Sequence, residues 1–171
     1  MTNLKDFIID VPNFPKDGVV FKDISPLLGS PEARSHTINL MADACKDIHI
    51  DAIAGFDSRG FLFGPTLADK VNKPFTMIRK AGKLPGPTVR ESYNLEYGSA
   101  TIEMQINPDF KNKNILLLDD VLATGGTASA GEKLVKKTGN HVAGFCFLIE
   151  LSGLNGKDLL ESENIFSLLS Y

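Results

Sequence analysis

Apolar residues recur along the chain with two different spacings. Between Pro31 and Ile48 they stand three and four positions apart after Ser30, which predicts an amphipathic helix with Ser30 as its N-cap. Between Ala100 and Ile106 they alternate with polar residues, as in a half-buried strand. The run from Ile115 to Leu118 is apolar throughout and indicates a strand buried on both faces, as a parallel sheet requires.

The other segments extend this pattern into alternating strands and helices. Further strands are expected at 51–56, 75–78, 141–151 and 166–169, and further helices at 61–71 and 128–137. This order predicts an α/β fold with a central, mainly parallel sheet flanked by helices and with ligands at the carboxyl edge of the sheet. A chain of 171 residues is the length of a single domain.

Composition narrows the class of protein. With 43% hydrophobic and 23% charged residues, the chain has the composition of an ordinary soluble globular protein, and its net charge of -3 argues against general nucleic-acid binding. There is no basic leader and no apolar run of ~18 residues, so neither secretion nor a membrane span is expected. Cys45 and Cys146 have apolar neighbours, which predicts core positions and a reducing, cytoplasmic setting.

The most informative segment runs from Ile115 to Thr127, where a buried strand reaches Asp119-Asp120 and a Gly125-Gly126 turn opens a helix. Glycines there let successive N–H groups point into a concavity, and the helix N-terminus adds partial positive charge, so a phosphate group would be held well. The two carboxylates can accept hydrogen bonds from vicinal sugar hydroxyls. The alternative is a solvated acid pair beside a helix cap. The lysine of a Walker loop is absent, which disfavours triphosphate hydrolysis.

Two further segments carry cations. In the turn from Gly55 to Gly60, Arg59 could bind a pyrophosphate oxygen pair, or Ser58 could simply cap a helix beside a solvated arginine. The segment from Arg79 to Arg90 is basic, rich in glycine and proline, and lacks acids, which is typical of a mobile binding loop or of a solvated surface loop.

The segment from Val11 to Pro26 holds too much proline and glycine for a helix. An extended backbone around Val20 and Lys22 could offer one N–H and one C=O to a flat polar ligand, and Phe21 could stack on it. The alternative is a packed arm with Phe14 and Phe21 buried.

Taken together, these segments resemble the adenine phosphoribosyltransferases over nearly the whole chain. The stretch 115–127 is similar to the phosphoribosyl pyrophosphate signature of type I phosphoribosyltransferases, and Asp57-Ser-Arg-Gly-Phe61 to the pyrophosphate loop. The stretch 79–98 is similar to the loop that closes over substrate, and 11–26 to the adenine-binding hood. The resemblance implies a type I phosphoribosyltransferase fold in one domain, with a hood at about 1–26, a core at about 31–151 and a flexible loop at about 79–98. It also implies transfer of the phosphoribosyl group to adenine, giving AMP and pyrophosphate.

The resemblance also assigns roles to individual residues. It implies ribose and 5-phosphate binding by Asp119, Asp120, Ala123, Thr124, Gly125, Gly126 and Thr127, pyrophosphate binding by Asp57, Ser58, Arg59, Arg79, Lys80 and Lys83, and adenine binding by Val20, Phe21 and Lys22. Lys22 stands where some members have arginine, which should matter little if recognition is by backbone. Arg59 and Glu96 are the implied catalytic residues, with Glu96 handling the proton near N7 and N9 of the base; a solvated glutamate at a strand end is the alternative for Glu96.

Three accessory features follow from the same resemblance. A cis peptide bond is expected between Asp57 and Ser58. Mg2+ is expected to bind mainly through substrate oxygens and water, without dedicated protein ligands. A homodimer is expected, because basic loop residues of related enzymes reach the pyrophosphate of a neighbouring subunit.

Two other functions compete with this interpretation. A phosphoribosyltransferase for hypoxanthine, guanine or xanthine would share the ribose and phosphate apparatus, and the hood favours adenine over these. A regulatory protein that senses phosphoribosyl pyrophosphate would carry an added DNA-binding domain, for which 171 residues leave no room.

Overall fold

The computed structural model describes residues 2–94, 98–108 and 110–171. The chain forms two compact units, Met1–Leu40 and Met41–Tyr171. In chain order the elements are η1 (Leu4–Phe7), β1 (Ile9–Pro12), β2 (Val20–Asp23), α1 (Ser25–Gly29), α2 (Pro31–Ala44), β3 (Ala52–Phe56), η2 (Arg59–Leu62), α3 (Gly64–Val71), β4 (Phe75–Lys80), β5 (Thr88–Asn94), β6 (Ser99–Gln105), β7 (Asn114–Leu122), α4 (Gly126–Lys137), β8 (His141–Glu150), η3 (Ser152–Leu154), η4 (Gly156–Leu159) and β9 (Ile165–Ser170).

The first unit is built around a hairpin. Strands β1 and β2 pair antiparallel, with Val11 opposite Phe21 and Pro12 opposite Val20. The aromatic rings of Phe14 and Phe21 meet edge to face with centroids 5.2 Å apart. The hairpin leads through α1 into α2, and the Ser30 hydroxyl accepts a hydrogen bond from the Ala33 N–H, as expected of an N-cap.

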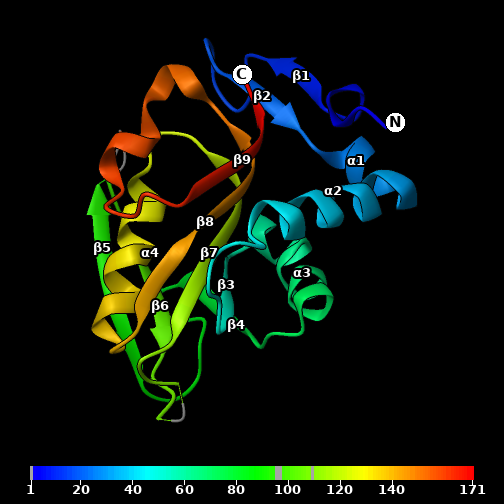
Figure 1. The fold of residues 1–171 in the computed structure, drawn as a ribbon. Coiled ribbons are helices and arrows are strands. Elements are labelled where there is room, and N and C mark those ends of the chain that lie inside the picture. The colour runs from blue at the N-terminus through cyan, green and yellow to red at the C-terminus, as the bar shows by residue number, and fades with distance from the viewer. Residues whose placement is uncertain (1, 95–97, 109) are drawn as a thin grey trace. The chain divides into compact units, whose positions relative to one another are not determined.

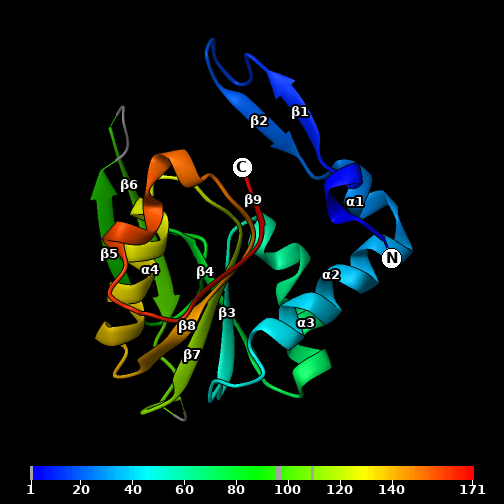
Figure 2. The same ribbon diagram turned by 45° about the horizontal axis from the view of Figure 1, so that its top comes forward.

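The second unit is an α/β layer structure. Within its described residues, a seven-stranded sheet runs in the order β5-β6-β4-β3-β7-β8-β9. Strands β4, β3, β7, β8 and β9 are parallel, and β6 and β5 add an antiparallel edge. Helix α4 packs on one face of the sheet and α3 on the other, as Figures 1 and 2 show. The predicted central, mainly parallel sheet flanked by helices is confirmed.

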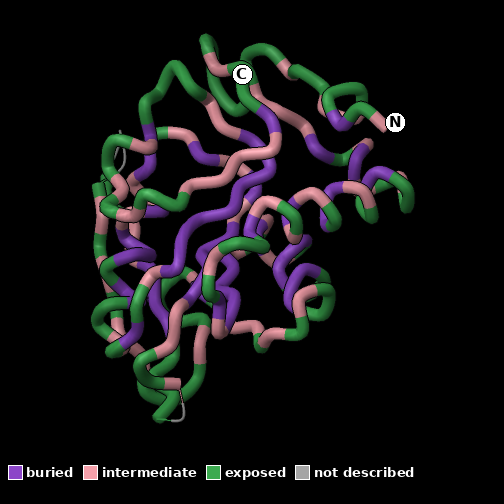
Figure 3. The backbone as a smooth tube through the Cα atoms, in the orientation of Figure 1, coloured by how far each residue is buried: buried purple, intermediate pink, exposed green. Residues whose placement is uncertain are grey.

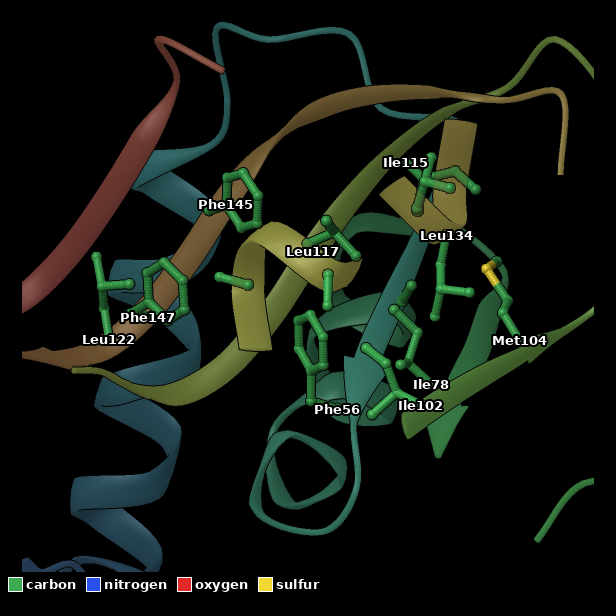
Figure 4. Close-up of a cluster of buried hydrophobic side chains, with 14 residues drawn as sticks. Phe56, Ile78, Ile102, Met104, Ile115, Leu117, Leu122, Leu134, Phe145 and Phe147 are labelled. Carbon is green, nitrogen blue, oxygen red and sulfur yellow. The ribbon is translucent and has the colours of Figure 1, made fainter. Parts of the chain in front are cut away.

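The core of the second unit lies between the sheet and α4 (Figure 4). Phe56 of β3, Leu117 of β7 and Phe145 of β8 meet Leu134 of α4, and all four are at most 2% exposed. The central strands are buried almost throughout, as the tube in Figure 3 shows, because both faces of a parallel sheet are covered. This burial explains the continuous apolar run in β7.

Several element boundaries differ from the sequence prediction; for example, α2 ends at Ala44 before the expected Ile48, and α3 begins at Gly64 after the expected Phe61. Strand β7 continues past the expected end at Leu118 to Leu122, because β8 remains beside it and pairs Leu122 with Glu150. Helix α4 begins at Gly126, two residues earlier than expected. The stretch 79–98, expected to form a flexible loop, contains the strand β5, which pairs with β6 from Thr88 to Asn94.

Both cysteines are core residues, as predicted. Cys45 is 3% exposed and Cys146 is 0% exposed, and neither forms a disulfide. The two thiols lie within hydrogen-bonding reach of each other, and this contact together with burial raises the pKa of Cys146 well above its usual range. Among the residues that the structure describes, no helix is long and apolar enough to cross a membrane.

Candidate active site

The turn that follows β7 has the geometry of an anion-binding cradle. Gly125 adopts φ +83° and acts as the N-cap of α4, so the backbone N–H groups at the start of the helix are directed into the turn. A cavity of about 80 Å³ lies there, lined by Asp119, by the residues from Val121 to Ala128, and by Phe56 and Phe147. This volume accommodates roughly five to eight water-sized groups, comparable with the five heavy atoms of a phosphate.

The neighbouring carboxylates, Asp119 and Asp120, occupy consecutive positions of β7 and therefore point to opposite faces of the strand. The Asp120 N–H donates to Asp119 Oδ1 at 2.9 Å. Burial raises the pKa of Asp119 well above its usual range, and the charge of Asp120 adds to this effect. Burial also raises the pKa of Asp120, while the Arg59 guanidinium acts in the opposite direction. The pair therefore favours an incoming cation or a hydroxyl donor.

The pyrophosphate loop predicted from sequence follows β3, which pairs directly with β7. The peptide bond between Asp57 and Ser58 is cis, as the resemblance implied. The Ser58 side chain makes no capping hydrogen bond within the described part of the chain, so the simple N-cap interpretation is wrong. Arg59 Nε lies 3.0 Å from Asp120 Oδ2, which brings the arginine of one predicted segment to the carboxylate pair of the other.

The basic residues of the next segment divide into two groups. Arg79 Nε donates to Asp57 Oδ2 at 2.9 Å, and Arg79 Nη1 donates to the Lys83 carbonyl at 3.2 Å. Arg79 thereby joins the pyrophosphate loop to the turn after β4. Lys80, the last residue of β4, and Lys83 in the following turn have exposed side chains. The structure thus brings Arg79 to the predicted site through its contact with Asp57.

Three residues around these segments were missed by the sequence interpretation. Tyr93 Oη accepts a hydrogen bond from Thr127 Oγ1 at 3.0 Å, and an added Cβ on Gly156 would stand 2.2 Å from the Ala123 carbonyl oxygen. Glu103 is completely buried beneath the turn that carries Lys83. No sequence signal marks Glu103 or Gly156. Glu103 stands at a position expected on the solvent face of an alternating strand, and Gly156 resembles an ordinary loop glycine.

The predicted adenine-binding residues belong to the first compact unit. Val20, Phe21 and Lys22 lie in β2, and the expected extended backbone is confirmed. Val20 and Lys22 are two residues apart in this strand, so their backbone N–H and C=O groups point to the same side of it. Lys22 Nζ pairs with Asp10 Oδ1 at 2.6 Å. Phe14 is 51% exposed, contrary to the alternative of a buried arm.

Glu96, the implied proton-handling residue, lies outside the described residues. No group of three or more His, Cys, Asp or Glu side chains that could hold a metal occurs in the described residues. The donor set at the carboxylate pair nevertheless fits Mg2+. Asp120 Oδ2 is buried and has no aligned hydrogen-bond donor among described residues, and Mg2+ in proteins is commonly held by one or two carboxylates together with substrate phosphates.

The comparisons with known proteins agree with this geometry. The sequence profile of the phosphoribosyl transferase domain matches residues 27–166. The chain belongs to the phosphoribosyltransferase family.

Its relatives narrow the class further. The adenine phosphoribosyltransferase of Thermosipho africanus is 47% identical over 167 residues, covering 98% of both chains. The crystal structure of the adenine phosphoribosyltransferase from Thermoanaerobacter pseudethanolicus matches with a TM-score of 0.95 and 39% identity, covering 98% of each chain. The Saccharomyces cerevisiae enzyme, in complex with adenine and an imino-altritol bisphosphate, matches with a TM-score of 0.91 and 38% identity, covering 97% of this chain and 96% of that one. Within its family, the chain belongs to the adenine phosphoribosyltransferases.

Proposed function

We propose that this chain transfers the 5-phosphoribosyl group from phosphoribosyl pyrophosphate to adenine, giving AMP and pyrophosphate. The observation that carries the proposal is the junction of two anion-binding elements on neighbouring strands. The ends of β3 and β7 bring the predicted pyrophosphate loop to the predicted phosphate and ribose turn, and Arg59 Nε and Asp120 Oδ2 meet there at 3.0 Å.

In this proposal each segment binds one part of the substrate. Ala123, Thr124, Gly125, Gly126 and Thr127 hold the 5-phosphate through backbone N–H groups and hydroxyls, as the cavity in that turn supports. Asp119 and Asp120 accept hydrogen bonds from the ribose hydroxyls. Asp57, Ser58, Arg59, Arg79, Lys80 and Lys83 surround the pyrophosphate.

Adenine recognition is assigned to the hairpin of the first unit. Val20 and Lys22 offer backbone N–H and C=O groups on one side of β2, which suit the adjacent N1 acceptor and N6 donor of adenine. Phe21 stacks on the base. Hypoxanthine and guanine carry an O6 acceptor in place of the N6 donor, so they would leave hairpin groups unpaired.

Catalysis in this scheme depends on positioning and on charge. The bond between ribose C1 and the pyrophosphate oxygen breaks, a bond from C1 to adenine N9 forms, and the adenine proton passes to Glu96. Arg59 and the basic side chains around it stabilise the departing pyrophosphate, and the closed site keeps water from an oxocarbenium-like carbon. Mg2+, which Asp119 and Asp120 would help to hold, neutralises charge on the pyrophosphate when it is bound.

We also propose that each chain is a single phosphoribosyltransferase domain and that two chains form a cytoplasmic homodimer. Leu62 and Met77 of the second unit are large apolar side chains that are 46% and 37% exposed, which supports a surface that a second subunit would cover. The free, buried cysteines fit a reducing compartment. Light scattering during gel filtration measures the mass of the particle, and a monomer at assay concentration would contradict the dimer.

The activity is tested by incubating the purified protein with phosphoribosyl pyrophosphate, Mg2+ and one base at a time. We expect AMP and pyrophosphate from adenine, with kcat/KM higher than for hypoxanthine or guanine by orders of magnitude. Comparable turnover of guanine would contradict the adenine assignment. Binding of phosphoribosyl pyrophosphate without turnover of any base would favour the regulatory function.

A further inference from the structure

We propose that Glu103 is a positioning residue for pyrophosphate binding: it holds the turn of residues 81–87 so that Lys83 and Arg79 are placed for the substrate. The proposal rests on the proposed function, because it assumes that these two cations bind pyrophosphate. Glu103 is not itself among the predicted substrate-binding residues and would act through the turn, whose Lys83 N–H it binds.

Glu103 lies on the face of β6 that is turned away from α4. Its neighbours Ile102 and Met104 belong to the core cluster that includes α4 residues, and successive side chains of a strand point to opposite faces. A glutamate on that face of an antiparallel edge would ordinarily be solvated, yet Glu103 is 0% exposed. The turn between β4 and β5 covers it.

The turn is attached to the carboxylate through its backbone. Glu103 Oε1 accepts hydrogen bonds from the N–H groups of Lys83 at 2.8 Å and Leu84 at 2.9 Å. Glu103 Oε2 accepts from Thr88 Oγ1 at 3.3 Å and from Arg90 Nε at 3.0 Å. One carboxylate thus binds both the turn and the first residues of β5. Charge-assisted hydrogen bonds are among the stronger ones in proteins, so Glu103 fixes this backbone more firmly than neutral contacts would.

The anchored turn is linked to the rest of the site by further polar contacts. Lys83 donates its N–H to Glu103, and its carbonyl accepts from Arg79 Nη1 at 3.2 Å. Arg79 Nε in turn donates to Asp57 Oδ2 at 2.9 Å, in the pyrophosphate loop. Two residues further along that loop, Arg59 pairs with Asp120 at 3.0 Å. Polar contacts, joined by the backbone between Asp57 and Arg59, therefore lead from Glu103 to the carboxylate pair.

This arrangement gives a specific role to a side chain that does not reach the substrate. Without the carboxylate, the turn that carries Lys83 would lose its attachment to β6, and Arg79 would keep only its contact with Asp57. Substrate binding would then have to order the turn, and the ordering cost would appear as weaker binding of phosphoribosyl pyrophosphate. Adenine binding and the rate at saturation would change much less.

The test uses Glu103→Gln and Glu103→Asp. The first removes the charge, and the second keeps it but withdraws the carboxylate by one C–C bond, about 1.5 Å, which takes the contacts at 2.8 and 2.9 Å beyond hydrogen-bonding range. We expect the KM for phosphoribosyl pyrophosphate to rise about tenfold in each variant, the factor for one lost charge-assisted hydrogen bond. The KM for adenine and kcat should stay within about threefold of wild type on the same reasoning. Trypsin should cleave after Lys83 faster than in the wild type.

Glu132→Gln is the matched control, because Glu132 is a buried glutamate of α4 that also accepts a backbone hydrogen bond, from Glu161 N–H. It should leave both KM values and the cleavage after Lys83 unchanged. An equal rise in KM in the control, or an unchanged KM in both Glu103 variants, would overturn the inference. If one Glu103 variant does not fold, the other decides.

A final experiment distinguishes a failure of this inference about Glu103 from a failure of the proposed function. In an Arg79→Gln background, Glu103→Gln should raise the KM for phosphoribosyl pyrophosphate by a smaller factor than in the wild type, because the two residues act through one turn. Fully multiplicative effects would show that Glu103 acts elsewhere. If Arg79→Gln alone left this KM unchanged, the pyrophosphate role of Arg79 would be wrong, whatever the Glu103 variants did.

Discussion

Replacing Gly156 by alanine should displace the phosphate-binding turn, although Gly156 lies outside the signature segment 115–127. A Cβ at this position would stand 2.2 Å from the Ala123 carbonyl oxygen and 2.9 Å from the Gly125 nitrogen. Contacts of a Cβ atom below 3.0 Å essentially do not occur, so Ala123 and the new methyl group must separate by about 0.8 Å. Both contacted residues belong to the proposed 5-phosphate site, so the displacement acts directly on substrate placement.

The size of the effect follows from this displacement. A misplacement of about 1 Å can reduce the rate of a positioned reaction about 100-fold. We therefore expect kcat/KM for phosphoribosyl pyrophosphate to fall by between about 10-fold and 100-fold in Gly156→Ala, with the KM for adenine nearly unchanged. Overpacking should also lower the stability by about 1–3 kcal/mol, or about 3–9 °C in Tm for a chain of this length.

Gly153→Ala is the control for this experiment. Gly153 lies three residues earlier, and an added Cβ there meets no heavy atom within 4 Å. Initial rates over a range of phosphoribosyl pyrophosphate concentrations, with thermal melts of all three proteins, give the comparison. A Gly156→Ala enzyme with kcat/KM within about twofold of wild type would refute the reasoning, because a shift of this size in the turn should not be silent.

The carboxylate pair, the basic turn and the buried glutamate give three more predictions. Changing Asp119 and Asp120 together to asparagine should lower kcat/KM for phosphoribosyl pyrophosphate at least ~100-fold, since two charge-assisted bonds are lost. The Tm of that variant should change little, because burial already disfavours both charges, and normal activity would make the pair structural. Trypsin should cut after Lys83 in the free enzyme and more slowly when phosphoribosyl pyrophosphate and Mg2+ are bound. Cleavage after Arg90, which is paired within β5, should be slow in both states. Equal cleavage after Lys83 with and without these ligands would exclude closure of the turn over the substrate. Burial raises the pKa of Glu103, but hydrogen bonds from the backbone N–H groups of the turn and from Arg90 outweigh it and lower the pKa from 4.5 to about 2. The ionised form therefore stabilises the fold above pH 4.5, and this contribution is lost as the pH falls towards 2. The free energy of unfolding, measured by urea melts between pH 5 and 3, should depend less on pH in Glu103→Gln than in the wild type, and an identical dependence would contradict this.

The sheet and the candidate phosphate turn could be predicted from the sequence because each has a local physical cause. The apolar run at Ile115–Leu118 indicates a strand buried on both faces, and Gly125 marks a turn that needs a positive φ. The pairing of β3 with β7, which brings Arg59 to Asp120, follows from strand order and is not encoded in either segment alone.

Other features depend on contacts between residues distant in sequence. The end of β7 is set by β8, so the local pattern placed it four residues too early, at Leu118. The strand β5 exists because β6 pairs with it along its whole length, although its own sequence is mainly polar. Glu103 follows the alternation of an exposed strand face, and only the folded turn buries it.

The adjacent thiols of Cys45 and Cys146 supply an intrinsic reporter of unfolding. Both side chains are buried and the pKa of Cys146 is raised, so neither should react with a thiol reagent while the core is intact. Labelling must then wait for an opening of the core that exposes β8, and its rate under native conditions measures how often that opening occurs. Ligands that bind only the folded state should slow the labelling in proportion to their occupancy, so substrate affinity can be read without following the reaction.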